Sequence, residues 1–246
     1  MKKLLSMLLV LTMAIAMLTL VACKPVDDPE DDTDPKGEGV MTHAEYVAAE
    51  EGTVVTIEAY VQAKQGWYND AIKVYLQDRD GGYIAYDLPC SEAEAAKLTV
   101  GTKIRVTGTK AIYKGLHEIY DAAATFEIIP GKTYVATAFD ATSILDNEEE
   151  LIKHQMELAS FTGLTVVSVA YNNATSAADA NDDIYVKVKL ADGEEHSFCV
   201  EVYLTGTSTE VYQTALTLKA GDVIDVEGFL YWWNNLNTHI TAITVK

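Results

Sequence analysis

The residues of this chain best suited to chemistry are aromatic and lysine side chains that recur at a few points along it. Indole and phenol rings stack on flat ligands such as nucleobases or sugar rings, and a neighbouring lysine supplies a charge or a hydrogen bond. Twelve residues form the candidate ligand-binding set: Trp67, Tyr68, Lys73, Tyr75, Tyr83, Tyr113, Lys114, His117, Tyr185, Lys187, Trp232 and Trp233. Strand propensity alone would also account for the strand tyrosines, and this alternative stays open.

The sequence shows none of the usual catalytic patterns. It has no Gly-rich phosphate loop and no Gly-x-Ser-x-Gly nucleophile turn. Glu150 and His154 stand four residues apart, but the second histidine of a helical zinc site is missing, and a solvated charged helix accounts for the pair. We therefore expect a non-enzymatic protein that uses no cofactor and no metal.

The charge balance limits the classes of ligand. The chain has 18 basic and 37 acidic residues, for a formal net charge of −19. Affinity for nucleic acid depends largely on neutralising phosphates, and a basic domain is its usual sign. One stretch is basic, where five cations oppose Glu118: Lys97, Lys103, Arg105, Lys110 and Lys114. The composition favours an oligosaccharide, a peptide or a protein partner, and it leaves weak binding of single-stranded nucleic acid to this stretch as the alternative.

The elements that must position these residues follow an order that occurs twice. In the first half, capping boxes at residues 42–45 and 91–94 predict two short helices. Alternating and β-branched segments predict five strands: residues 54–63, 72–77, 83–88, 103–113 and 116–120. The Asp-Gly-Gly sequence at residues 80–82 predicts a hairpin turn in which both glycines take positive φ.

The second half repeats this order with longer connections. A charged helix is expected over residues 146–159 and a linking stretch over residues 205–216. Strands are expected at residues 164–171, 184–190, 196–203, 222–232 and 236–245. Both halves also space two glycines seven residues apart: Gly101 and Gly108, then Gly221 and Gly228. A glycine inside a strand marks a bulge or a tight bend, so each half is expected to turn a corner there.

Five strands with a helix between the third and the fourth follow the order of the OB-fold, a small Greek-key barrel. The phrase Gly-x-x-Ile-x-Val-x-Gly at residues 101–108 resembles the fourth-strand region of OB-fold domains in exported bacterial nucleases and lipoproteins. We predict an all-β fold with short helices, made of two tandem five-stranded OB-fold-like barrels over residues 41–130 and 131–246. A generic β-sandwich is the alternative that strand alternation leaves open.

The OB-fold resemblance implies where the candidate residues lie. Ligands of this fold bind on the outer face of strands two and three, between the loops that join strands one to two and four to five. Lys73, Tyr75 and Tyr83 are then expected to face outward in the first barrel, and Tyr185 and Lys187 in the second. The loops supply the rest of the set: Trp67, Tyr68, Tyr113, Lys114, His117, Trp232 and Trp233. The two last-named tryptophans have an alternative role, in which they join the barrels or bind a partner protein and no small ligand exists.

The N-terminus carries an export signal. Two lysines, an apolar run and a Leu-Val-Ala-Cys ending resemble the lipobox signal of bacterial lipoproteins. The resemblance implies that residues 1–22 are removed and that Cys23 is lipidated, which anchors the chain to the membrane. Residues 23–40 are acidic and rich in proline, which predicts a disordered stalk. The expected location is the bacterial cell membrane, facing outside the cytoplasm. Disulfides can form there, and a disulfide between Cys90 and Cys199 is one of two alternatives, the other being two free thiols.

Overall fold

The computed structural model describes residues 36–246. The predicted signal peptide, the lipidation site Cys23 and residues 24–35 of the predicted stalk lie outside the described residues. Lys36 forms an ion pair with Asp78. The residues from Lys36 onward therefore pack against the first β-barrel, and the stalk does not extend to residue 40 as expected.

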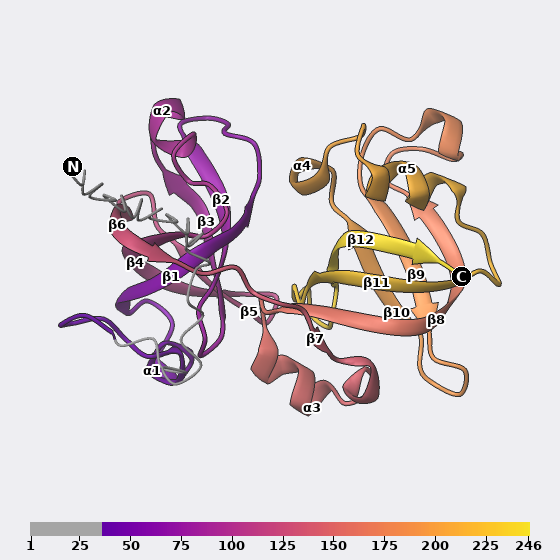
Figure 1. Ribbon diagram of the computed structural model, residues 1–246, viewed down its shortest axis with the longest axis horizontal. Helices are drawn as coiled ribbons and strands as arrows, with labels where there is room; N and C mark the ends of the chain where they lie inside the picture. Colours follow the sequence, from indigo (N-terminus) through magenta and orange to yellow (C-terminus); the bar gives the residue numbers. More distant parts are fainter. Residues whose placement is uncertain (1–35) are drawn as a thin grey trace, which may run out of the picture. The chain divides into compact units, whose positions relative to one another are not determined.

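Barrel one is built from the first six strands (Figure 1). Its elements are α1 (His43–Ala48), β1 (Val54–Lys64), β2 (Ala71–Gln77), β3 (Gly82–Pro89), α2 (Glu92–Ala95), β4 (Thr102–Tyr113), β5 (Leu116–Tyr120) and β6 (Thr125–Thr133). The strand order is β1-β2-β3-β5-β4, and a β1–β4 pairing closes the ring. β3 and β5 run parallel, and β6 adds a sixth strand beside β4. This order, with α2 between β3 and β4, is that of an OB-fold barrel.

Barrel two repeats this topology with the remaining strands (Figure 1). Its main elements are β7 (Phe139–Asp140), α3 (Glu148–Leu151), β8 (Leu158–Tyr171), β9 (Ile184–Lys189), β10 (His196–Val200), α4 (Val202–Thr205), α5 (Glu210–Thr217), β11 (Val223–Phe229) and β12 (His239–Val245). The order β8-β9-β10-β12-β11 closes through a β11–β8 pairing, β10 and β12 run parallel, and β7 pairs with β8. The predicted fold class is therefore confirmed, with one strand added to each barrel.

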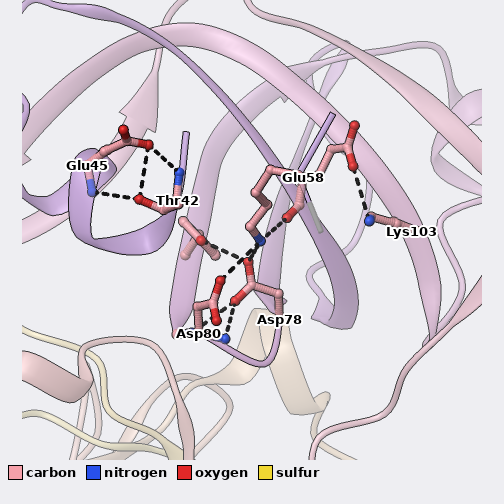
Figure 2. Close-up of polar contacts among 9 residues, drawn as sticks. Thr42, Glu45, Glu58, Asp78, Asp80 and Lys103 are labelled. Atoms are coloured by element: carbon pink, nitrogen blue, oxygen red, sulfur yellow. Dashed lines mark hydrogen bonds and ion pairs between the residues drawn. The ribbon is translucent and has the colours of Figure 1, made fainter. Parts of the chain in front are cut away.

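The two helix starts predicted from capping boxes are confirmed. α1 and α2 begin with complete capping boxes at Thr42 and Ser91, and Figure 2 shows the pair of Thr42 and Glu45. In each box the N-cap hydroxyl accepts from the backbone N–H three residues on, and the glutamate there accepts from the N-cap backbone. These contacts depend on four consecutive residues, which explains why the sequence predicts them well.

Two longer expectations in the second half are wrong. The helix expected over residues 146–159 is limited to α3 and a 3-10 turn, and β8 already begins at Leu158. Leu158 pairs with Phe229 of β11, so the closure of the barrel overrides local helix propensity there. The linking stretch expected over residues 205–216 instead includes most of α5, with Thr209 as its N-cap.

Glycines in the barrel corners allow close packing. A Cβ at Gly108 would lie 2.7 Å from Ile119 Cγ2, and one at Gly228 would lie 2.4 Å from the His239 carbonyl oxygen. β11 shifts register at Gly228, which confirms a bulge, whereas the pairing of β4 with β1 runs through Gly108 without a shift. The glycines of the β2–β3 turn do not take the expected positive φ. A Cβ at Gly82 would lie 2.3 Å from the backbone of Met156, so close approach is the reason for glycine at that position.

The two barrels share part of their apolar core. Barrel one has its own cluster, but Tyr75, Ile84 and Leu116 from its outer face belong to the cluster of barrel two. Residues 36–246 accordingly belong to one compact unit. Among residues 36–246, no helix is both long and apolar enough to cross a bilayer.

Candidate ligand-binding cleft

The loops that join strands four and five of each barrel contact each other. The Asn234 N–H donates to the Lys114 carbonyl oxygen at 2.6 Å. Trp232 is 2% exposed, and a Cβ at Gly115 would lie 2.9 Å from its indole Cδ1. Trp232 therefore joins the barrels, as its alternative role predicted, and it is not available to a ligand.

Tyr75 is turned toward the outer face of β2 as predicted, but its expected exposure is wrong. Its side chain is fully buried against barrel two, where its ring centre lies 5.0 Å from that of Phe229. Its hydroxyl forms a 2.8 Å hydrogen bond with His239 Nδ1. Strand parity gave the correct face, but only the fold shows that a second barrel covers this part of it.

Tyr83 faces the core of barrel one, so its assignment to the outer face is wrong. It pairs with Leu76, its ring packs on Tyr46, and its hydroxyl donates to Asp78 Oδ2 at 2.8 Å. The Asp78 N–H bonds to the Gly81 carbonyl, so the hairpin turn begins at Asp78 and sets the strand register. The aromatic residue that β3 presents on its outer side, next to Lys73, is Tyr86, which sequence reasoning missed.

A cavity of about 440 Å³, the first cavity, lies between the outer faces of strands two and three of both barrels. Barrel one contributes Lys73 and Tyr86, while β9, β10, the residues next to them, the β11–β12 connection and the start of β12 form the remaining wall. That wall consists of Asp183, Tyr185, Ser197, Cys199, Glu201, Tyr231, Trp233, Asn235, Asn237 and His239. Because these faces are where OB-folds hold ligands, the cavity is the natural candidate site.

A second cavity, of about 690 Å³, adjoins the first. It shares Lys73, Tyr86 and Glu201 with the first cavity, so the two cavities adjoin, and together they are called the cleft below. Its other lining residues are Gln65, Gly66, Trp67, Tyr68, Ala71, Ile72, Asp87 and Tyr203. The predicted loop residues Trp67 and Tyr68 therefore do line a cavity, together with residues from barrel two.

A tight turn presents these two aromatic residues. Tyr68 and Ala71 exchange backbone hydrogen bonds at 3.0 and 3.1 Å around Asn69 and Asp70, which take φ of 52° and 57°. Asn and Asp are the non-glycine residues that tolerate this left-handed conformation best, which explains their place here. The Trp67 indole N–H donates to the Cys90 carbonyl at 2.8 Å, so the ring is held in place while 37% exposed.

Burial shifts the pKa values of three polar groups that line the first cavity. Burial and the adjacent Asp183 raise the pKa of Glu201 to about 7, and burial also raises the pKa of Asp183. Burial, with a smaller effect of Lys73, lowers the pKa of His239 to about 3, so its ring is uncharged at pH 7. The Lys73 ammonium lies 3.7 Å from the Tyr86 ring centre and is the cation that lines both cavities.

Three cations of the basic stretch predicted in barrel one are already paired with groups of the same chain. Lys103 lies 3.1 Å from Glu58 (Figure 2), and Arg105 pairs with Glu58 and with Glu127. The buried Lys110 ammonium donates to three backbone carbonyls at 2.7–2.8 Å. These cations are therefore not free to form a phosphate-binding surface.

The remaining candidate residues divide between the cleft and its surroundings. Tyr185 and Trp233 line the first cavity, whereas Lys187 pairs with Glu195 at 3.2 Å and lies outside the cleft. Tyr113 meets Trp233 edge to face with ring centres 5.3 Å apart, and Lys114 lies 5.9 Å from the same ring. These two residues support Trp233 from barrel one without lining either cavity.

His117 is also outside the cleft. Its backbone N–H donates to Gln155 Oε1 at 3.1 Å, and burial lowers its pKa to about 4. Cys90 and Cys199 are both free thiols, so the possible disulfide does not form in this structure. Within the described part of the chain, no group of three or more His, Cys, Asp or Glu residues could hold a metal ion.

Sequence reasoning missed four of the residues that define the cleft: Tyr86, Asp183, Glu201 and His239. A correct β2–β3 register would have identified Tyr86, since the turn length fixes which residues share a face. The others come from barrel two and line the cleft because that barrel packs on the first. No local pattern in the sequence indicates this packing.

No protein-family model matches this chain, and no curated protein sequence is similar to it. The chain is similar to the solved structure of an Ifi202 HINa domain in complex with 20-bp double-stranded DNA, with 13% identity, 79% of this chain and 97% of that chain covered, and a TM-score of 0.35. It is also similar to a murine DNA-binding protein bound to double-stranded DNA, with 9% identity, 78% of this chain and 94% of that chain covered, and a TM-score of 0.36. A third similar structure is a replication protein A heterotrimer bound to single-stranded DNA, with 13% identity, 87% of this chain and 70% of that chain covered, and a TM-score of 0.30. At these TM-scores the likeness carries no weight, and the fold assignment depends on the strand order.

Proposed function

We propose that this protein is a non-enzymatic binding module that holds an uncharged oligosaccharide in the cleft. The observation that carries the proposal is the lining of the first cavity, where four aromatic side chains surround amide, imidazole and carboxyl groups: Tyr86, Tyr185, Tyr231 and Trp233. Aromatic rings pack on the apolar faces of sugar rings, and amides and carboxyl groups exchange hydrogen bonds with hydroxyls. A concave site with a few convergent polar groups is typical of small-ligand binding.

The charge of the cleft favours a neutral ligand over a polyanion. Asp183, Glu201 and Asp87 line the cleft, against the single lysine Lys73. Strong binding of a phosphate backbone requires several cations, because affinity comes from neutralising phosphates. A single-stranded nucleic acid is therefore the weaker candidate, even though other OB-folds use the same faces for it.

The anchoring predicted from the N-terminus forms the second part of the proposal. The protein is then a bacterial lipoprotein held outside the cytoplasm by lipid on Cys23, which keeps the cleft close to the cell surface. Replacing Cys23 with Ser is expected to move the protein from the membrane fraction to the soluble fraction. Metabolic labelling with a fatty acid provides the measurement, and unchanged labelling of the variant would remove the lipid anchor from the proposal.

Calorimetric titration of the purified protein tests the choice of ligand. The probes are cello-, malto- and xylo-oligosaccharides, a uronic acid oligosaccharide and poly-dT, each at two salt concentrations. We expect binding of at least one neutral series with little dependence on salt. Binding of poly-dT that weakens steeply with salt would show a nucleic-acid module instead. Binding of none of the probes would favour an adaptor that contacts other proteins.

A further inference from the structure

We infer that the cleft binds its oligosaccharide as a chain across two stacking sites, one in each cavity, which are joined between Lys73 and Glu201. This inference rests on the proposed function and adds the length and placement of the ligand. A single compact sugar would fill one cavity and leave the other empty. The structure instead favours a ligand of several rings, because the two cavities adjoin and each has its own aromatic side chains.

Each cavity has aromatic rings that its neighbour lacks. Trp233, Tyr185 and Tyr231 line the first cavity, and Trp67, Tyr68 and Tyr203 line the second. Four of these rings are exposed and so open to contact by a ligand: Trp67, Tyr68, Tyr203 and Trp233. Aromatic rings in two adjoining cavities provide two separate places for a sugar ring to stack.

The junction between the cavities carries polar groups that the protein leaves available. Glu201 is only 9% exposed, and its Oε2 accepts from Gln65 Nε2 at 2.9 Å and from the Leu204 N–H at 2.7 Å. The Tyr203 backbone N–H also hydrogen-bonds to this carboxyl group, which lines both cavities. A carboxylate has about four acceptor positions, so a ligand hydroxyl at the junction is a suitable further donor. In the first cavity itself, the buried Asn237 Oδ1 has no hydrogen-bond partner among the described residues.

Lys73 lies at the same junction on the side of barrel one. Its ammonium packs on the Tyr86 ring and forms no ion pair with any residue that the structure describes. It therefore retains N–H donors for a ligand oxygen. An acceptor and a donor at the junction suit the hydroxyl and ether oxygens that lie between two stacked sugar rings.

The tryptophans allow a direct test. The chain has three: Trp233 in the first cavity, Trp67 in the second, and the buried Trp232. Binding of cello-, malto- and xylo-oligosaccharides of one to six units to the purified full chain is measured by calorimetry. We expect affinity to increase about tenfold between two units and the longest member, which corresponds to one further stacked ring.

Two matched variants separate the stacking sites. Trp67→Ala is expected to remove the gain in affinity with length while leaving the affinity for two units within about twofold. Trp233→Ala is expected to weaken every length about tenfold. Melting temperatures of both variants check that the fold is retained. The buried Trp232 remains in both fluorescence variants. Trp67→Phe, which retains the exposed Trp233, is expected to respond to short and long ligands, whereas Trp233→Phe, which retains the exposed Trp67, is expected to respond only to long ones.

The outcomes distinguish this inference from the proposed function. Equal affinity for two and six units, or an equal effect of both alanine variants at every length, would overturn the two-site inference and leave glycan binding intact. No binding at any length would overturn the proposed function and the inference together.

Discussion

At the scale of single residues, Glu118 on β5 is a buried carboxyl group with an unsatisfied oxygen. Its side chain is 4% exposed, and its Oε2 has no hydrogen-bond partner among the described residues. Burial raises its pKa to about 7, with a smaller contribution from Asp87 and an opposing one from Lys73. The folded state therefore favours the protonated form of this group.

This gives a prediction for the pH dependence of stability. The folded pKa of Glu118, about 7, lies above its ordinary value of 4.5, so its stabilising effect is complete below pH 4.5 and is lost as pH rises through 7. The loss is on the order of 2–3 kcal/mol. Glu118→Gln is expected to raise the free energy of unfolding relative to wild type at pH 8, and much less at pH 5. Urea unfolding at both pH values provides the measurement.

The exposed Glu50 provides the control. Glu50→Gln is expected to leave the difference in stability between pH 5 and pH 8 unchanged. If Glu118→Gln behaves in the same way, the carboxyl group is solvated and the assigned burial is wrong.

At the scale of elements, the C-terminal end of α1 depends on a side chain from β4. α1 has only six residues, and the Lys110 ammonium donates to the carbonyls of Tyr46, Val47 and Ala49 at 2.8, 2.8 and 2.7 Å. A lysine at the end of a helix satisfies carbonyls that have no partner within the helix. The short helix is thus held to the barrel from a distance of about 60 residues in sequence.

Lys110→Met is expected to lower the free energy of unfolding by about 2–3 kcal/mol, because three buried or half-buried carbonyls lose a charged donor. Amide hydrogen exchange of residues 43–49 is expected to increase more than that of β9. The exposed Lys97, replaced by Met, provides the matched control and is expected to change stability by less than about 0.5 kcal/mol. Equal effects of the two replacements would show that the contact of Lys110 with α1 is unimportant.

The same elements show what the sequence can and cannot predict. The helix starts at Thr42 and Ser91 were predictable because a capping box is complete within four residues. Leu158 was assigned to a helix because its neighbours are good helix formers, but its pairing with Phe229, 71 positions away, places it in β8. The strand order was predictable from the repeat, whereas the cleft was not, because Tyr75 and Glu201 meet other residues only when one barrel packs on the other.

At the scale of the whole molecule, the shared core predicts that both barrels unfold together. Tyr75 and Leu116 of barrel one lie in one apolar cluster with Trp232 and Phe229 of barrel two. Trp232→Ala is expected to lower the free energy of unfolding by about 3–5 kcal/mol, because it leaves a large cavity. It is also expected to split a single thermal transition into two, since the barrels lose much of their contact. Differential scanning calorimetry measures both effects.

Trp233 provides the control for this experiment. Its indole is 43% exposed, so Trp233→Ala is expected to preserve one transition with a change of about 1 kcal/mol or less. Two transitions in wild type would show that the barrels unfold independently and that the shared core contributes little.

The cover that barrel two provides for Tyr75 also matters during synthesis. The ribosome completes barrel one at Thr133, but the roughly 100 residues that follow, up to Trp232, take roughly 5–20 s to add. Throughout that interval the nascent chain carries Tyr75, Ile84 and Leu116 on an uncovered outer face. A chain that stops near residue 133 would keep this face exposed permanently. Stalled or truncated products are therefore expected to be substrates for chaperones and proteases, even though the complete protein is not.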